Sequence, residues 1–177
     1  NQTKATADSE QPTKANAKKL VPAKTMAEYC DEISKLTAKR LLVKLPSEAQ
    51  VKDFSLILQK TLGEKIKVFN ISTPENMVCS SEFVKRNIEN NIAEVKEGPG
   101  GALHDFLQDN DSDSDVIWDL TNFSASSIVR NNTAIDDKAR AIDGTNVPDK
   151  CKIIVLMNYN SPKAYKGGDF NSRFDHT

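Results

Sequence analysis

The feature that most constrains this chain is an alternation between short apolar segments and longer amphipathic ones. Residues 40–45, 65–71, 116–119 and 152–157 are rich in apolar, β-forming side chains and are the length of buried strands. Between them, residues 46–62, 80–95 and 124–137 place apolar side chains at helical spacing. Strands that alternate with helices in this way are best satisfied by a parallel sheet covered on both faces. We therefore expect a three-layer α/β/α fold with a mainly parallel sheet of four to five strands.

The rest of the chain divides into a tail, a flanking helix and short connections. Residues 1–25 carry almost no large apolar side chain, which predicts a disordered tail or linker. Met26, Tyr29, Ile33 and Leu36 recur at helical spacing, so residues 26–38 are predicted to form a flanking helix before a core of residues 39–177. A short helix is expected over residues 102–108, followed by an acidic, solvated loop over residues 109–115.

Charge and cysteine content narrow the classes of protein. The chain has 24 lysine and arginine residues and 25 aspartate and glutamate residues. The overall charge therefore gives no reason to expect nucleic acid or an anionic membrane as partner. No apolar run approaches the roughly 20 residues that cross a bilayer, so we expect no membrane insertion. Cys30, Cys79 and Cys151 are too few and too far apart for a disulfide framework. A cytoplasmic location is the expectation.

Three segments of the second half carry a resemblance to a known family. Residues 116–123 begin with an apolar strand that ends in Asp119, as a Walker B strand does, and residues 153–158 are a strand segment that ends in Asn158, as a sensor 1 strand does. Residues 165–175 end in Ser-Arg-Phe-Asp around Arg173. In this order and spacing, the chain resembles a P-loop-NTPase-like AAA+ domain of the branch that contains dynein, midasin and the methylcytosine restriction GTPases.

The resemblance implies roles for three residues. Asp119 would hold magnesium, Asn158 would sense the γ-phosphate, and Arg173 would reach the nucleotide of a neighbouring subunit. Each also has a structural interpretation: Asp119 as a cap, Asn158 as a partner of loop backbone, and Arg173 as half of a salt bridge. The small helical lid that follows the arginine segment in the family is not expected within residues 39–177.

The chain departs from the family at the phosphate loop. That loop needs GxxxxGK[ST], in which backbone N–H groups and a lysine surround the phosphates and a hydroxyl holds magnesium. The register on the first strand places Gln50 at the lysine and Val51 at the hydroxyl, and Glu48 sets a carboxylate where phosphates would bind. Leu120 occupies the general-base position after Asp119. The degenerate loop comprises Lys44, Leu45, Pro46, Ser47, Glu48, Ala49, Gln50 and Val51.

Other candidate sites carry weaker patterns. Gly98-Pro-Gly-Gly101 precedes a helix, but no lysine and hydroxyl follow it and no predicted strand leads into it. The acidic loop lacks the glycine and glutamate of an EF-hand. A phosphatase site with Asp119 as nucleophile would need an acid where Thr121 stands. We assign no role to His104, His176 or Cys79.

These observations predict a degenerate AAA+-like module that binds no cofactor, does not hydrolyse nucleotide and acts through contact with a protein. The partner would be another protein or a neighbouring AAA+-like domain. One alternative is an active NTPase with an atypical phosphate loop that takes Mg-ATP or Mg-GTP. Another is an α/β domain that binds a small molecule.

Overall fold

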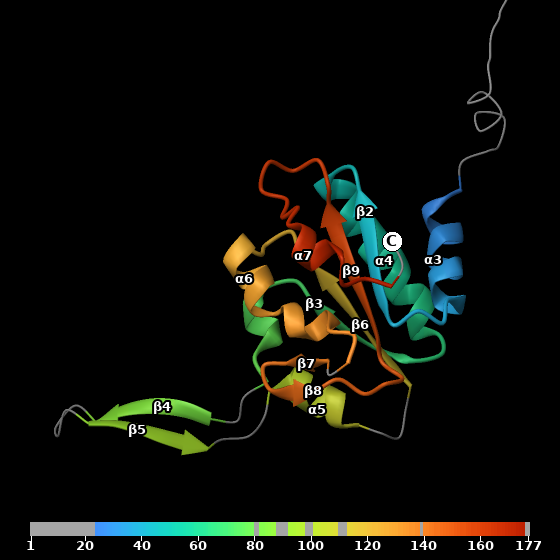
Figure 1. The fold of residues 1–177 in the computed structure, drawn as a ribbon. Coiled ribbons are helices and arrows are strands. Elements are labelled where there is room, and N and C mark those ends of the chain that lie inside the picture. The colour runs from blue at the N-terminus through green and yellow to red at the C-terminus, as the bar shows by residue number, and fades with distance from the viewer. Residues whose placement is uncertain are drawn as a thin grey trace, which may run out of the picture.

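Four strands form one parallel sheet at the centre of the molecule (Figure 1). The computed structural model describes residues 24–79, 82–87, 92–97, 101–109, 113–138 and 140–175. The sheet has the order β2-β9-β6-β3, so the last strand lies between the first and the third. The strands are β2 (Arg40–Leu45), β3 (Lys67–Ile71), β6 (Ser114–Asp119) and β9 (Lys152–Asn158). The predicted α/β class is confirmed, and the sheet is consistent with a P-loop-NTPase-like fold.

Helices cover both faces of this sheet, which gives the three predicted layers (Figure 1). On one face lie α3 (Met26–Lys35) and α4 (Glu48–Gly63). On the other lie η1 (Pro74–Met77), α5 (Ala102–Gln108), α6 (Ala125–Arg130), η2 (Asn132–Ile135) and α7 (Gly168–Asn171). Successive side chains of β9 point to opposite faces of the sheet. Ile154 packs in the core beneath α3 and α4, and Ile153 and Val155 pack in the core on the other face.

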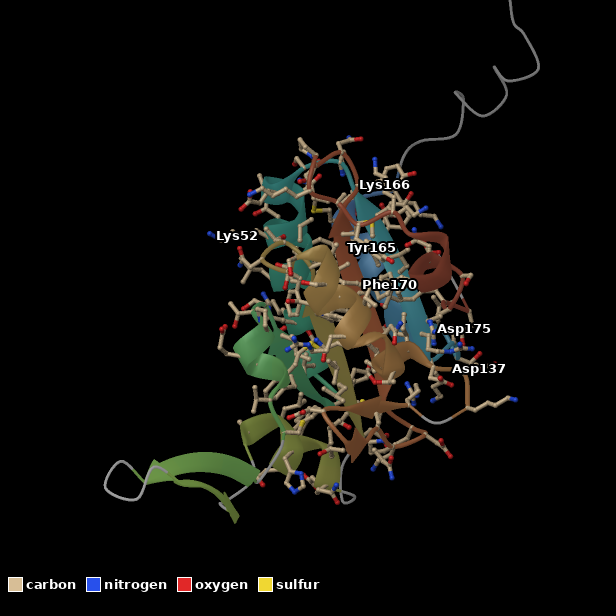
Figure 2. The ribbon with its side chains drawn as sticks, turned by 60° about the vertical axis from the view of Figure 1, so that its left-hand side comes forward. Lys52, Asp137, Tyr165, Lys166, Phe170 and Asp175 are labelled. Carbon is tan, nitrogen blue, oxygen red and sulfur yellow. The ribbon has the colours of Figure 1, made fainter. Side chains whose placement is uncertain are left out.

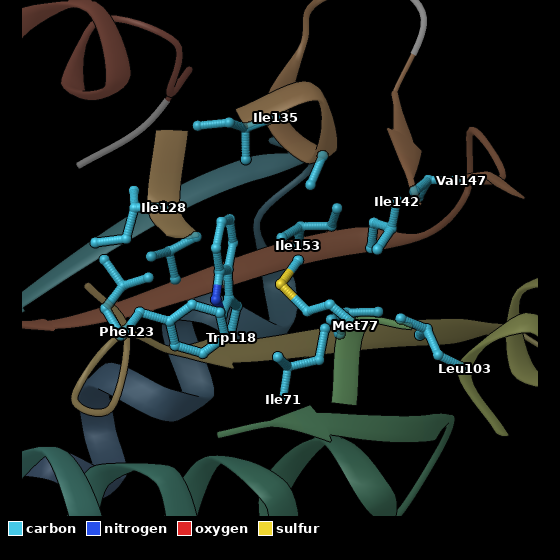
Figure 3. Packing of buried hydrophobic residues seen from close by; sticks show 14 of the residues in the cluster. Ile71, Met77, Leu103, Trp118, Phe123, Ile128, Ile135, Ile142, Val147 and Ile153 are labelled. Carbon is cyan, nitrogen blue, oxygen red and sulfur yellow. The ribbon is translucent and has the colours of Figure 1, made fainter. Parts of the chain in front are cut away.

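Trp118 is at the centre of the larger core (Figure 3). Its ring meets Phe123 at 5.6 Å and Phe170 at 5.9 Å between centroids, both edge to face. Phe170 in turn contacts Phe174 at 5.3 Å and Tyr165 at 5.8 Å. This aromatic series fixes the segment around α7 against the sheet.

Residues 82–87 and 92–97 correct the prediction of a helix over residues 80–95. They form an antiparallel hairpin of β4 (Glu82–Asn87) and β5 (Ile92–Glu97), which is a sheet of its own. The sequence has Asn87 at the end of β4 and Asn90 and Asn91 between the two strands, and asparagine favours turns over helix interiors. Phe, Val and Ile on either side favour strands, and the helical spacing of these apolar residues was coincidental.

The predicted helix over residues 124–137 is shorter than expected. It divides into α6, a turn at Asn131 and the 3₁₀ helix η2. The Asn131 side chain donates to the carbonyl of Ser127 at 2.8 Å, and short polar side chains of this kind compete with regular helix bonding. The helix therefore loses its regular form at the first of two asparagines.

Two further connections differ from the sequence prediction. Ser114 and Asp115, assigned to a solvated loop, are buried residues of β6. Residues 141–146, for which no element was predicted, form a small hairpin of β7 (Ala141–Ile142) and β8 (Thr145–Asn146). Asp143 and Gly144 both have positive φ, 48° and 81°, as a tight Asp-Gly hairpin turn requires. Within the described residues, no helix is long and apolar enough to cross a membrane.

Candidate functional site

The carboxyl ends of the strands, where parallel α/β sheets bind ligands, contain a cleft of about 370 Å³. Its walls come from the end of β9, from the loops that follow β6 and β9, from α6 and from the start of α4. Polar side chains, Thr121, Asn122, Asn158 and Ser161, face the cleft with one acid, Glu48, and one lysine, Lys163. The apolar part of the lining comprises Leu120, Phe123, Ile128, Met157, Pro162, Ala164 and the ring of Tyr165.

The turn from β2 to α4 is where a phosphate loop would lie in the family. Only Pro46 and Ser47 separate the end of β2 at Leu45 from the start of α4 at Glu48. Ser47 caps the helix: its Oγ accepts from the Gln50 N–H at 3.2 Å, and its carbonyl accepts from the Val51 N–H at 3.0 Å. A turn this short has no backbone with which to surround a phosphate group.

The residues of the predicted degenerate loop point in different directions. Val51 is buried in the core between α4 and the sheet, as is Leu45. Gln50 lines a separate groove of about 580 Å³ between α3 and β2. Ala49 and Pro46 are exposed, and Lys44 extends over the ring of Tyr159. Glu48 is therefore the member of this set that lines the cleft.

Asp119 lies at the tip of β6, half-buried. Its Oδ1 accepts from the Thr121 N–H at 2.9 Å and from Thr121 Oγ1 at 2.6 Å, which closes a turn directly after the strand. The next residue, Leu120, is buried, and its N–H donates to the Leu156 carbonyl at 3.0 Å. Within the described part of the chain, His, Cys, Asp and Glu side chains do not gather in groups of three or more that could hold a metal ion.

Asn158 ends β9 and faces the cleft. Its Oδ1 accepts from the Asn160 N–H at 3.3 Å, and the Asn160 side chain donates to the Pro46 carbonyl at 3.2 Å. This chain of bonds ties the loop after β9 to the β2–α4 turn. The structure thus brings Asp119 and Asn158 to one edge of the sheet, at neighbouring strand ends.

Arg173 lies at the opposite edge, near the amino end of β2. Its carbonyl accepts from Arg40 Nη1 at 2.6 Å, and its guanidinium lies 3.7 Å from the Asp136 carboxylate. Figure 2 shows the separation: Tyr165 and Lys166 lie toward the carboxyl edge, and Asp175 and Asp137 toward the other. Arg173 therefore does not share the cleft with Asp119 and Asn158.

The remaining sequence candidates have structural contacts. His104 Nδ1 lies 3.2 Å from Thr145 Oγ1, which joins α5 to β8. Cys79 is buried, burial raises the pKa of its thiol, and its N–H donates to Asp143 at 2.7 Å. His176 lies outside the described residues, as do Gly98, Pro99 and Gly100.

The glycine-rich segment corrects one point of the sequence prediction, because Gly98 directly follows the strand β5. Gly101 caps the seven-residue helix α5, and a Cβ there would lie 2.8 Å from the Val78 carbonyl oxygen. Close packing is therefore sufficient to require a glycine at this position.

Comparison with known proteins adds little to this geometry. No family model and no curated protein matches the chain. A solved structure from Cytophaga hutchinsonii, described as a "putative ATPase", is similar with a TM-score of 0.43 and 17% identity. The match covers 86% of this chain and 44% of that one. The α/β assignment rests on the strand order and layers of the chain itself.

Proposed function

We propose that this chain is a P-loop-NTPase-like module that does not hydrolyse nucleotide and acts through contact with a protein partner. The observation that carries the proposal is the two-residue turn between β2 and α4, where Ser47 caps the helix. A working phosphate loop places several backbone N–H groups and a lysine around the phosphates. In this chain the corresponding helix start presents the Glu48 carboxylate to the cleft.

Asp119 supports the same proposal from the neighbouring strand. Its Oδ1 is committed to Thr121, and the buried Leu120 beside it has no group that could activate water. We propose that Asp119 and Asn158 shape loops at this edge and that the chain binds neither Mg-ATP nor Mg-GTP. The partner is another protein or a neighbouring AAA+-like domain, met in the cytoplasm.

A phosphate-release assay with Mg-ATP and with Mg-GTP tests the first half of the proposal. The expected rate equals that of buffer alone at every protein concentration. A rate that rises in proportion to the protein, and that is lost in Asp119→Ala and Asn158→Ala variants that remain folded, would establish an active NTPase with an atypical loop.

A role for Arg173 at a neighbour's nucleotide is a second part of the proposal. Its side chain is 29% accessible, so it can in principle exchange Asp136 for an anion of another subunit. Arg173→Ala is expected to leave the far-UV circular dichroism of the chain unchanged. An unfolded variant would assign Arg173 to the fold alone.

The cleft favours one alternative, an α/β domain that binds a small molecule. Its volume of about 370 Å³ and its asparagine, threonine and serine side chains suit a small polar compound. A screen of polar metabolites by melting temperature distinguishes this alternative, because any compound that binds the cleft raises the melting temperature and does so less in Asn158→Ala.

A further inference from the structure

We propose that the carboxyl edge of the sheet carries a docking site for an acidic segment of a protein partner, formed by Lys44 and Lys166 around Tyr159 and by Lys163 on the loop that follows Tyr159. This inference rests on the proposed function and names the chemistry of the partner that the contact module would bind.

Tyr159 is the fixed point of this surface, which we call the lysine–tyrosine cluster. It follows β9 directly, and its N–H donates to the Leu45 carbonyl at 2.8 Å, which holds it between the ends of β9 and β2. The Nζ of Lys44 lies 4.8 Å from the centre of its ring, and the Nζ of Lys166 lies 4.5 Å from it. One tyrosine ring thus gathers two ammonium groups from separate parts of the chain.

Lys163 extends the cluster along the same loop. Its backbone N–H donates to Ser161 Oγ at 3.1 Å, which shapes the turn, and Lys163 contributes to the rim of the cleft. All three lysines are exposed, and Tyr159 is 39% accessible. The surface is therefore open to a macromolecule.

The cations of this cluster differ in their salt bridges from the arginines at the other edge of the sheet. There, Arg40 lies 3.7 Å from Asp175, and Arg173 lies 3.7 Å from Asp136. Within the described residues, Lys44, Lys163 and Lys166 form none of the salt bridges. Because the whole chain has a formal net charge of −1, this gathering of positive charge is local. The two ammonium groups at the Tyr159 ring repel each other, and an anionic ligand relieves that repulsion.

The geometry favours carboxylates of a peptide over the phosphates of a nucleotide. The β2–α4 turn beside the cluster offers no backbone cradle, and Glu48 adds negative charge to the wall of the cleft. Spread cations around a partly exposed tyrosine match the polar rim and aromatic residues of protein interfaces. Steering of an acidic segment by such a rim is expected to weaken as salt rises.

Fluorescence anisotropy with a fluorescein-labelled peptide of alternating Glu and Gly tests the proposal, with a Gln-Gly peptide as the neutral probe. The whole chain is expected to bind the Glu peptide, more weakly at higher salt, and to leave the Gln peptide free. The triple variant K44E/K163E/K166E should bind at least about tenfold more weakly.

The matched control is K60E/K65E/K138E, which makes the same change in net charge at three other exposed lysines. It should lose less than half of the affinity. Equal losses in the two triple variants would overturn the proposal, because binding would then follow net charge alone. Circular dichroism checks the fold of each variant. If the triple variant does not fold, the single variant Lys166→Glu, in an exposed loop, replaces it in the binding assay.

Two more measurements make the result decisive. Tyr159→Leu keeps the apolar bulk and removes the aromatic ring, so it should weaken binding several-fold. A labelled single-stranded DNA that binds more tightly than the Glu peptide through the same lysines would overturn the choice of partner. If the Glu peptide does not bind, the proposed docking site is wrong, but the proposal of a non-hydrolysing module is unaffected. Binding of Mg-ATP at the cleft would contradict the proposed function, whether or not the Glu peptide binds.

Discussion

The Asp119 carboxylate accepts both the backbone N–H and the hydroxyl of Thr121, at 2.9 and 2.6 Å, through the same oxygen. These two hydrogen bonds close the turn after β6. They engage the carboxylate to which the AAA+ resemblance assigns a magnesium ion. The same residue type at the same strand tip is compatible with either role, and the contacts in this chain are those of a structural turn.

The first prediction concerns this turn. Asp119→Ala should lower the free energy of unfolding by about 1–3 kcal/mol, because it removes two hydrogen bonds to a charged acceptor. Asp119→Asn keeps an acceptor oxygen and should lose less. Urea denaturation measures both changes. Addition of magnesium chloride should leave the melting temperature of the wild type unchanged, and a magnesium-dependent rise that disappears in Asp119→Asn would make Asp119 a metal ligand.

The second prediction concerns the cap of α4. Ser47→Ala should lower the free energy of unfolding by about 1 kcal/mol, because the Gln50 N–H loses its acceptor at the helix start. Ser126→Ala, at an exposed serine in the first turn of α6, is the control and should change stability by less than about 0.5 kcal/mol. Equal effects of the two substitutions in urea denaturation would show that the Ser47 cap contributes nothing specific.

The third prediction concerns Asp175, which closes the far edge of the sheet. Its carboxylate accepts from the N–H groups of Lys39 at 3.2 Å and Arg40 at 3.0 Å, and its own N–H donates to the Arg40 carbonyl. Asp175→Ala should therefore cost about 1–3 kcal/mol of unfolding free energy. Asp137→Ala, an exposed acid of the same edge, should cost less than about 0.5 kcal/mol. The interpretation fails if thermal denaturation ranks the two variants in the reverse order.

The fourth prediction concerns pH and the buried Asp115 of β6. Burial raises the pKa of its carboxyl from 3.8 to about 6, although the backbone N–H of Lys152 donates to it at 3.1 Å. The folded chain therefore keeps this proton to higher pH than the unfolded chain does. The associated stability is complete below about pH 4 and is lost as the pH rises through about 6, by about 3 kcal/mol in all.

Asp115→Asn, which keeps an oxygen to accept from Lys152, should remove this part of the pH dependence. Urea denaturation of both proteins between about pH 4 and pH 7 gives the comparison. The wild type should lose stability relative to the variant across this range. A difference between the two proteins that does not change with pH would contradict the assigned pKa.

The sequence predicted the sheet because buried parallel strands have a strong local signature. Residues 40–45 and 152–157 are mostly apolar, and the structure places both in the sheet with ends within one residue of the prediction. The antiparallel pair of strands at residues 82–87 and 92–97 was not predicted, because the apolar residues of this segment also recur at helical spacing. The Asp-Gly pair at 143–144 is a local hairpin signal, and both of its residues have the positive φ of a tight turn.

The candidate site was harder to predict than the fold. Sequence order identified Asp119 and Asn158 as strand-end residues, and the structure places both at the carboxyl edge. The directions of Gln50 and Glu48 could not be read from the sequence, because they depend on how α4 packs on the sheet. The convergence of Lys44 and Lys166 on Tyr159 joins residues more than a hundred positions apart, which no local pattern reports.

The most direct test of the central claim is the melting temperature of the whole chain in millimolar Mg-ATP and Mg-GTP, with calorimetric titration alongside. A ligand at a hundred times its Kd stabilises a protein by about 2.7 kcal/mol, which for a chain of this size raises the melting temperature by roughly 5–10 °C. We predict no change in melting temperature and no heat of binding with either nucleotide. A micromolar Kd together with such a rise would contradict the account, because it would require a phosphate site that the turn at Pro46 and Ser47 does not provide.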